Sequence, residues 1–218
     1  MSEENRRTLE VYEKKAKDFL GTTLKHYNLN PEKADKKEER LKKFLKDSFE
    51  MLPKGSKIFE VGCSDGKNSK YIESLGYDVL ASDVAKDFVE IASNNGMKTI
   101  KFNLLEDEFK EKYSGILAWR VFVHFTKDDC IKALHKIYQA LNEGGLFVFN
   151  LMNREIREVD HEWVDFQNEY YLGVERYYNY FSEDFMNKAI EDNNFKIVQS
   201  FKEGGENNNK WLVYVLQK

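Results

Sequence analysis

The apolar residues near the beginning of the chain recur every three or four positions, a spacing typical of amphipathic helices. It predicts one helix over residues 8–28 and a second over 32–50, which ends before Pro53-Lys-Gly55. We expect residues 1–50 to form a helical cap that lies over a binding pocket as a lid.

From Lys57 onward, short apolar runs alternate with helical patterns, which is typical of a parallel sheet with right-handed crossovers. The last two apolar runs flank the polar segment 203–209 and indicate an antiparallel hairpin. Residues 51–218 are therefore expected to form one α/β domain. Its predicted strands are 57–61, 78–82, 98–102, 115–119 and 145–151, its helices 67–75, 85–94, 127–141 and 182–193, and its hairpin 195–201 with 211–217.

The segment from Lys57 to Asp83 has the order of a nucleotide-binding cradle: strand, glycine loop, helix, strand and acidic residue. Gly62 and Gly66 allow a tight turn and let the backbone approach a ligand closely. Asp83 follows Gly62 by 21 residues, close to the ~20 expected for a carboxylate that accepts hydrogen bonds from a ribose. The segment predicts a site for an adenosine-containing ligand beyond the carboxyl ends of the strands.

The same loop makes NAD the weaker candidate ligand. A dinucleotide fingerprint needs glycine at positions 62, 64 and 67, and this chain has Gly62, Ser64 and Lys67. The terminal hairpin also disfavours a dinucleotide-binding fold, which would favour a sixth parallel strand.

The segment Glu60-Val-Gly62-Cys-Ser64-Asp-Gly66 resembles motif I, [DE]-x-G-x-G-x-G, of the class I S-adenosylmethionine-dependent methyltransferases, with Ser64 in place of the central glycine. The resemblance covers most of residues 40–218. It implies a Rossmann-like, seven-stranded, mostly parallel sheet of order 3-2-1-4-5-7-6, with helices on both faces and a terminal antiparallel hairpin. It also implies S-adenosyl-L-methionine as the cofactor and S-adenosyl-L-homocysteine as the product.

The resemblance assigns expected roles to individual residues. Glu60 would orient the methionine ammonium group, Gly62 and the next few residues would line the methionine portion, and Asp83 would bind the ribose. Asn103 would hold the adenine, or would only cap a turn at the end of a strand. The expected cofactor-binding residues are Tyr12, Glu60, Gly62, Cys63, Ser64, Asp65, Gly66, Asp83, Val84, Asn103, Leu104 and Trp119.

Two residues after the fourth predicted strand are the candidates for catalysis. Arg120 falls where the cofactor and the acceptor should meet, and its guanidinium suggests a carboxylate or phosphate on the acceptor. A salt bridge with Glu60 or another nearby acid is the alternative. His124 is the first candidate for a general base, because it titrates near neutrality. Its alternative role is a hydrogen bond to backbone at the junction of strand and helix.

An insert at about residues 152–181 is rich in tyrosine, tryptophan and arginine and is expected to recognise the acceptor. Alternatively, alternate residues in 170–181 face the core from an extra strand. The expected substrate-binding residues are Arg120, Asn150, Arg154, Tyr170, Arg176, Tyr177 and Tyr178.

Composition and charge indicate which binding partners the protein is expected to have. The formal net charge of −4 argues against nucleic acid, and the lysine-rich run 33–46 is interleaved with acids as on a solvated helix face. Cys63 and Cys130 have the spacing of neither a disulfide framework nor a zinc site, so no metal is expected. The sequence shows neither a signal peptide nor an apolar stretch of membrane length. We expect a cytoplasmic monomer or homodimer.

The predicted function is in-line transfer of a methyl group to an oxygen or nitrogen of a small metabolite, an acidic one if Arg120 faces the pocket. No [DN]-P-P-[YF] or Pro-Cys element follows the fourth strand, which disfavours a flipped base as acceptor. A protein side chain stays open as the acceptor. The alternatives are an NAD-dependent oxidoreductase and a non-catalytic regulatory protein that binds S-adenosylmethionine.

Overall fold

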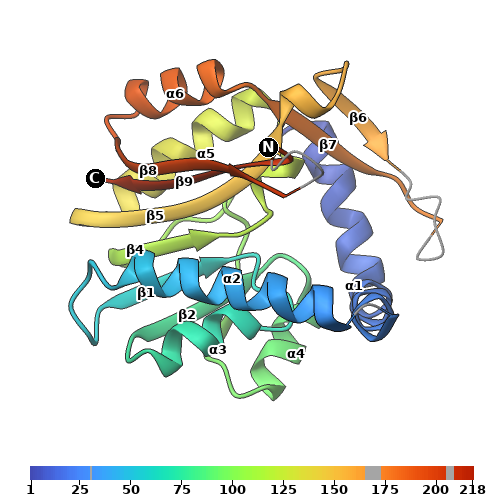
Figure 1. Ribbon diagram of the computed structural model, residues 1–218, viewed down its shortest axis with the longest axis horizontal. Coiled ribbons are helices and arrows are strands. Elements are labelled where there is room, and N and C mark those ends of the chain that lie inside the picture. The colour runs from blue at the N-terminus through green and yellow to red at the C-terminus, as the bar shows by residue number, and fades with distance from the viewer. Residues whose placement is uncertain (30, 165–172, 205–208) are drawn as a thin grey trace.

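The computed structural model describes residues 1–29, 31–164, 173–204 and 209–218, without the side chains of 22–29. Its core is a sheet in which five parallel strands lie in the order β3-β2-β1-β4-β5 (Figure 1). The buried run Ile58–Val61 shows why β1 lies in the middle, since both of its faces are covered. The strands are β1 (Lys57–Val61), β2 (Asp78–Asp83), β3 (Thr99–Lys101), β4 (Tyr113–Ala118) and β5 (Leu141–Asn153).

The end of the chain forms the predicted antiparallel hairpin. β9 (Trp211–Gln217) pairs antiparallel with β5, and β8 (Lys196–Glu203) pairs antiparallel with β9. With these two strands counted as the sixth and seventh of the family's sheet, the predicted order 3-2-1-4-5-7-6 is confirmed.

The insert adds two strands that the seven-strand prediction did not include. β6 (His161–Val164) pairs with β7 (Arg176–Phe181), and β7 runs parallel to the end of β5. Met152 of β5 pairs with β7 and with β9 at once, so these two neighbours lie on opposite edges of β5. β7 therefore takes the edge that β4 leaves after Phe149.

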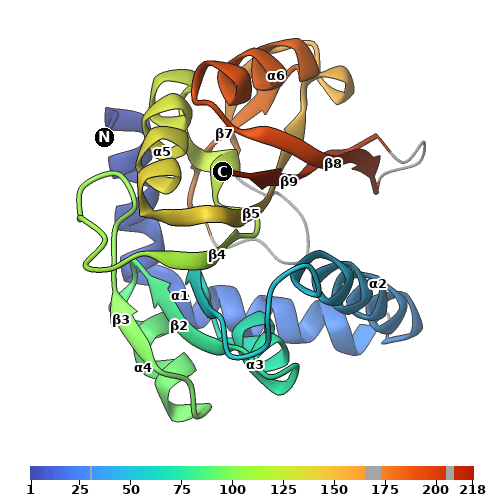
Figure 2. The ribbon, with the colours of Figure 1, turned by 90° about the vertical axis from the view of Figure 1, so that its left-hand side faces the viewer.

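Helices cover both faces of the sheet (Figures 1 and 2). The apolar sides of α2, α3 and α4 pack in one core cluster with β1 and β2, and those of α5 and α6 pack on the opposite face. Thr126 and Ser182 cap α5 and α6 by accepting a hydrogen bond from a backbone N–H of the first turn. The bounds are α2 (Pro31–Phe49), α3 (Lys67–Ser74), α4 (Lys86–Asn94), α5 (Lys127–Ala140) and α6 (Glu183–Asp192).

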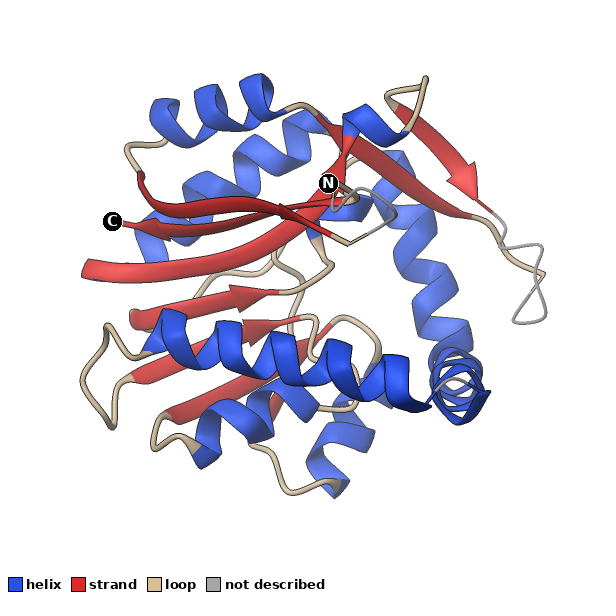
Figure 3. Cartoon of the chain, viewed as in Figure 1, coloured by secondary structure: helices blue, strands red, loops and turns tan. Residues whose placement is uncertain are grey.

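The first helix, α1 (Glu3–Leu29), lies across the end of the sheet to which the parallel strands point (Figure 3). Asn5 Nδ2 donates to the carbonyl of His124 at 3.1 Å, and the N–H of Tyr177 donates to Thr8 Oγ1 at 2.9 Å. The guanidinium of Arg7 lies 4.0 Å from the ring centre of Trp163. The apolar pattern places the start of this helix at residue 8, but the helix begins at Glu3. Its first turns are fixed by polar contacts, which the apolar pattern does not show.

The packing of α2 on the sheet depends on a glycine in β4. A Cβ atom on Gly115 would lie 2.5 Å from Ile58 Cδ1 and 2.9 Å from Phe49 Cε1. Both neighbours are fully buried. Only a residue without a side chain therefore allows Phe49 to seat against β1 and β4.

We predict that Gly115→Ala lowers the free energy of unfolding by about 1–3 kcal/mol, because overpacking forces side chains from their rotamers. Ile58→Val removes the closest atom, so the double variant should be more stable than the sum of the two single effects, as measured by urea denaturation. Gly21→Ala in α1 is the control, since its Cβ would meet nothing within 4 Å. Strict additivity would contradict the packing argument.

Candidate functional site

A cavity of about 490 Å³ lies beyond the carboxyl ends of the central strands. Its wall is formed by α1, the loops after β1 to β4, β7 and the start of β9. It brings together most of the residues that the sequence singles out. Those in the wall are Tyr12, Gly62, Ser64, Asp83, Val84, Asn103, Leu104, Trp119, Arg120, His124, Arg176 and Tyr178.

The loop after β1 is joined to the end of β2. Ser64 has a left-handed backbone (φ 52°), and its N–H donates to Asp83 Oδ2 at 3.0 Å. The N–H of Ala85 donates to Asp83 Oδ1, also at 3.0 Å. Burial raises the pKa of Asp83 to about 6, although the backbone donors favour its charged form. Asp83 thus presents a nearly buried carboxylate, 6% exposed, at the cavity wall.

The other loop residues lie behind this wall. Gly66 directly precedes α3 with φ 80°, and Cys63 is buried in the core. Asp65 accepts a hydrogen bond from the N–H of Lys67 at 3.3 Å. None of these three is among the residues that line the cavity.

Glu60 is also absent from the cavity wall, and its carboxylate is fully buried. Asn68 Nδ2 donates to Glu60 Oε1 at 3.2 Å, and Ser69 Oγ donates to Glu60 Oε2. Burial raises the pKa of Glu60 to about 7, the two side-chain donors acting in the opposite direction. The carboxylate is thus bonded to the first turn of α3, directly beneath the glycine loop.

The wall after β2 and β3 is mainly apolar. Phe88 and Leu104 are buried there and line the cavity together with Val84 and Asn103. Asn103 Oδ1 accepts a hydrogen bond from the N–H of Leu105 at 3.0 Å, as in a capped turn. Asn103 therefore combines both geometries considered from the sequence, a turn cap and a polar group at the cavity.

His124 belongs to a hydrogen-bonded chain that also includes α1 and β7. Its Nδ1 lies 2.7 Å from the carbonyl of Tyr177, so Nδ1 carries the proton, and Nε2 accepts from the hydroxyl of Tyr12 at 2.9 Å. Arg176 Nη1 donates to the same hydroxyl at 2.7 Å. Burial, with a smaller contribution from the charge of Arg176, lowers the pKa of His124 to about 3. The imidazole is neutral, and both of its nitrogens are bonded.

Arg120 leaves β4 in a left-handed conformation (φ 62°) that places it in the cavity wall. Asn150 accepts a hydrogen bond from its backbone N–H at 2.6 Å and does not itself line the cavity. The guanidinium lies 5.3 Å from the ring centre of Trp211, and desolvation lowers its pKa. In the described part of the chain, Arg120 forms no ion pair with Glu60 or with another acid.

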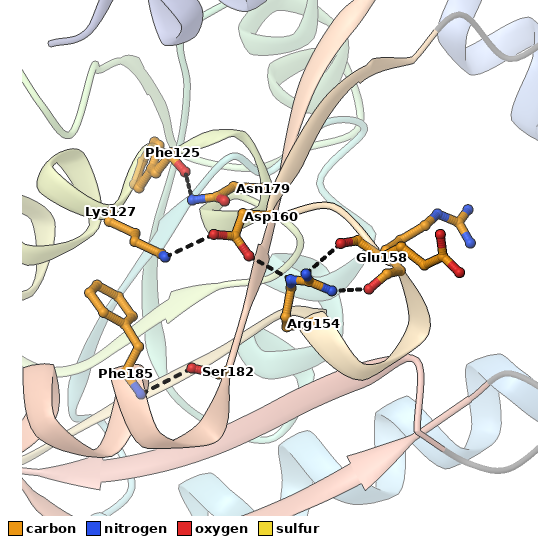
Figure 4. Close-up of polar contacts among 9 residues, drawn as sticks. Phe125, Lys127, Arg154, Glu158, Asp160, Asn179, Ser182 and Phe185 are labelled. Carbon is orange, nitrogen blue, oxygen red and sulfur yellow. Dashed lines mark hydrogen bonds and ion pairs between the residues drawn. The ribbon is translucent and has the colours of Figure 1, made fainter.

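The insert divides into residues that reach the cavity and residues that do not. Side chains alternate along β7, so Arg176 and Tyr178 line the cavity while Tyr177 packs against Trp163 on the other face. Arg154 binds Asp160 at 2.5 Å and the carbonyl of Glu158, away from the wall (Figure 4). Tyr170 lies outside the described residues.

Sequence reasoning missed thirteen wall residues, and all of them except Val61 lie outside the glycine motif. Asn5 is 1% exposed, and its Oδ1 has no hydrogen-bond partner among the described residues. A buried polar residue within an apolar helix face is the signal that could have singled it out. The missed residues are Asn5, Leu9, Phe19, Leu20, Val61, Phe88, Phe102, Val121, Val123, Phe125, Met152, Lys210 and Trp211.

A family model described as a methyltransferase domain matches residues 33–200. The match covers more than half of the chain, so the chain belongs to this family of methyltransferase domains. This confirms the predicted class, an S-adenosylmethionine-dependent methyltransferase of class I, over the NAD-dependent oxidoreductase. Helix α1 and strand β9 lie outside the matched residues.

The curated proteins that match this chain have low sequence identity to it. The probable S-adenosyl-L-methionine-dependent methyltransferase TehB of Haemophilus influenzae is 22% identical over 130 residues, which cover 49% of this chain and 46% of that protein. The chain thus spans about half the length of the curated relatives it matches.

Solved structures share the fold. An S-adenosylmethionine-dependent methyltransferase from Methanosarcina mazei aligns with a TM-score of 0.66 at 15% identity, covering 77% of this chain and 94% of that one. Magnesium protoporphyrin IX methyltransferase from Synechocystis PCC 6803, solved with bound S-adenosylmethionine, aligns with a TM-score of 0.63 at 12% identity, covering 83% and 77%. Among the described helices of the present chain, none has the length and apolar character needed to cross a membrane.

The raised pKa values of Glu60 and Asp83 predict a specific dependence of stability on pH. Glu60 titrates near its ordinary value of 4.5 when unfolded and at about 7 when folded. The folded protein therefore binds more protons between these values, and stability falls as pH rises through 7. Between pH 5 and 8, the titration of Glu60 should lower the free energy of unfolding of the ligand-free protein by a value on the order of 3 kcal/mol. Urea denaturation should show that this decrease is absent in Glu60→Gln. Parallel pH curves for the two proteins would contradict this.

Proposed function

We propose that the cavity binds S-adenosylmethionine along the edge formed by β1 and β2, and that a methyl group passes to an oxygen or nitrogen of a small acceptor held near Arg120 and β7. The observation that carries this proposal is the Asp83 carboxylate. It is fixed by two backbone N–H donors, is nearly buried and lines the cavity. A ribose supplies hydroxyl donors that suit its remaining lone pairs.

The residues present fit the cofactor along its length. Asp83 would bind the ribose, Asn103 and Leu104 the adenine, and Gly62 with Ser64 the methionine portion. Glu60 would act from beneath the loop by fixing the start of α3. When bound, S-adenosylmethionine supplies an activated methyl group on a sulfonium, and the electron pair of the broken C–S bond stays on sulfur.

The contribution of this chain's own residues is alignment and exclusion of water. Tyr12, Phe19 and Leu20 of α1 close one side of the cavity, which supports the role of α1 as a lid. The cavity volume falls in the range of about 300–1,000 Å³ typical of small-molecule sites. Enclosure by α1 and β7 favours a metabolite over a protein side chain as the acceptor.

The position of His124 supports a positioning role better than that of a general base. Its pKa of about 3 makes it a weak base at neutral pH, and its two nitrogens already hold Tyr12 and the Tyr177 carbonyl. We therefore assign His124 to holding Tyr12 at the cavity.

Arg120 in turn supports an acidic acceptor, because its guanidinium forms no ion pair among the described residues.

Asp83→Asn should weaken the binding of S-adenosylhomocysteine by at least about tenfold, because a charge-assisted hydrogen bond to the ribose is lost. Isothermal titration calorimetry measures the affinity, and circular dichroism checks that the fold is kept. Asp78→Asn at the opposite end of β2 is the matched control, since Asp78 pairs with Lys98 at 2.7 Å on the surface. An unchanged affinity in Asp83→Asn, or tighter binding of NAD by the wild type, would contradict the proposal.

A further inference from the structure

Two cationic side chains line the part of the cavity next to the ends of β4 and β9, and a third lies close to them. Arg120 and Lys210 both line it. Lys37 of α2 is exposed and does not line the cavity, but its amine is close enough to them that desolvation, together with the charges of Arg120 and Lys210, lowers its pKa to about 8. The pKa of Lys210 is lowered as well, by desolvation and then by Arg120 and Arg157. A chain of net charge −4 thus gathers positive charge at its own pocket.

Within the part of the chain that the structure describes, no ion pair neutralises these three charges. Among the described residues, none of the three side chains forms a hydrogen bond or an ion pair. Glu203 of β8 is near enough to raise the pKa of Lys37 and of Arg120, yet it forms an ion pair with neither. Lysines further along α2 behave differently, since Lys42 binds Glu38 at 2.6 Å. The run 33–46 is solvated at Lys37 as expected, since this residue is exposed, but Lys37 has no ion pair among the described residues.

Clustered like charges in a partly desolvated wall repel each other more strongly than they would in bulk water. A multiply charged anion removes this repulsion and supplies acceptor oxygens for the unused N–H donors. The hydrogen bond that the Arg120 backbone N–H donates to Asn150 and the contact with the Trp211 ring fix Arg120 beforehand, so little conformational freedom is lost on binding.

We propose that the methyl acceptor carries a doubly charged anionic group, a phosphate or a pair of carboxylates, which binds between Lys37, Arg120 and Lys210 with the indole of Trp211 as an apolar wall. The inference rests on the proposed function, because it names the class of acceptor for that site. The single carboxylate of S-adenosylmethionine would neutralise only one of the three charges. The cluster therefore fits an acceptor better than it fits the cofactor.

The test measures anion binding by calorimetry at constant ionic strength and pH 7.0, with and without saturating S-adenosylhomocysteine. The probes are phenyl phosphate and phthalate as dianions, and benzoate as the singly charged control. The variants are Arg120→Met, Lys210→Met and Lys37→Met. Lys36→Met is the matched control, because it removes the same charge from the adjacent and likewise exposed position of α2, about 100° away around the helix.

We expect at least one dianion to bind the wild type at least tenfold more tightly than benzoate, and each cluster variant to lose at least fivefold of that affinity. Lys36→Met should keep it. Preference for phenyl phosphate or for phthalate identifies the anionic group. The affinity for S-adenosylhomocysteine should stay within twofold in all variants, which separates this inference from the proposed function.

Three results would overturn the inference. The first is equal binding of benzoate and the dianions, and the second is a loss in Lys36→Met as large as in the cluster variants. The third is a fivefold or larger loss of S-adenosylhomocysteine affinity in the cluster variants, which would assign the cations to the cofactor carboxylate. If S-adenosylhomocysteine fails to bind the wild type, the proposed function fails, and the titrations without it still decide whether the cluster binds anions.

A pH series gives an independent readout at Lys37. The charged groups that act on its amine are Arg120, Lys210 and Arg40, with Glu203 opposing them. An anion raises the pKa of Lys37 again, so binding takes up protons and the anion affinity falls as pH rises through 8. Lys37→Met should flatten this decline between pH 7 and 9, whereas Lys36→Met should retain it.

Discussion

The hydrogen bond from the Ser64 N–H to the Asp83 carboxylate is the interaction on which the site depends. It joins the loop after β1 to the end of β2 and fixes Ser64 in a left-handed conformation. It also holds a carboxylate where hydration is poor, which is why the pKa of Asp83 is raised despite its backbone donors. The protein thus keeps a costly charge at the cavity, and a ligand with hydroxyl donors compensates for the missing water.

The sequence predicts the parts of the fold that depend on local signals. The alternation of apolar runs and helical patterns predicts the parallel sheet, and the polar segment 203–209 predicts the hairpin. The spacing of Gly62 and Asp83 brings both to one cavity, as expected for a glycine loop followed by an acidic residue. Ser64 adopts a backbone that usually favours glycine, so the exchange in motif I leaves the course of the loop intact.

The remaining features depend on contacts between residues that are distant in sequence. Glu60, Asn150 and Arg154 carry groups suited to ligand binding, and each is instead bonded to its own protein. Nothing in their local sequence indicates this. Lys210 and Trp211 reach the cavity because β9 pairs with β5 along the whole length of β9. The register of this pairing cannot be read from the local sequence.

Strand β5 runs past the end of β4, and its last residues carry β7 on the vacated edge. The single strand β5 therefore supports both β4, which belongs to the parallel sheet that carries the glycine loop, and β7, which faces the proposed acceptor site. The reach between them is set by the length of this overhang, residues 150–153. Lengthening or shortening the overhang would resize the room for the acceptor while leaving the glycine loop in place, which gives proteins of this design a simple route to new substrates.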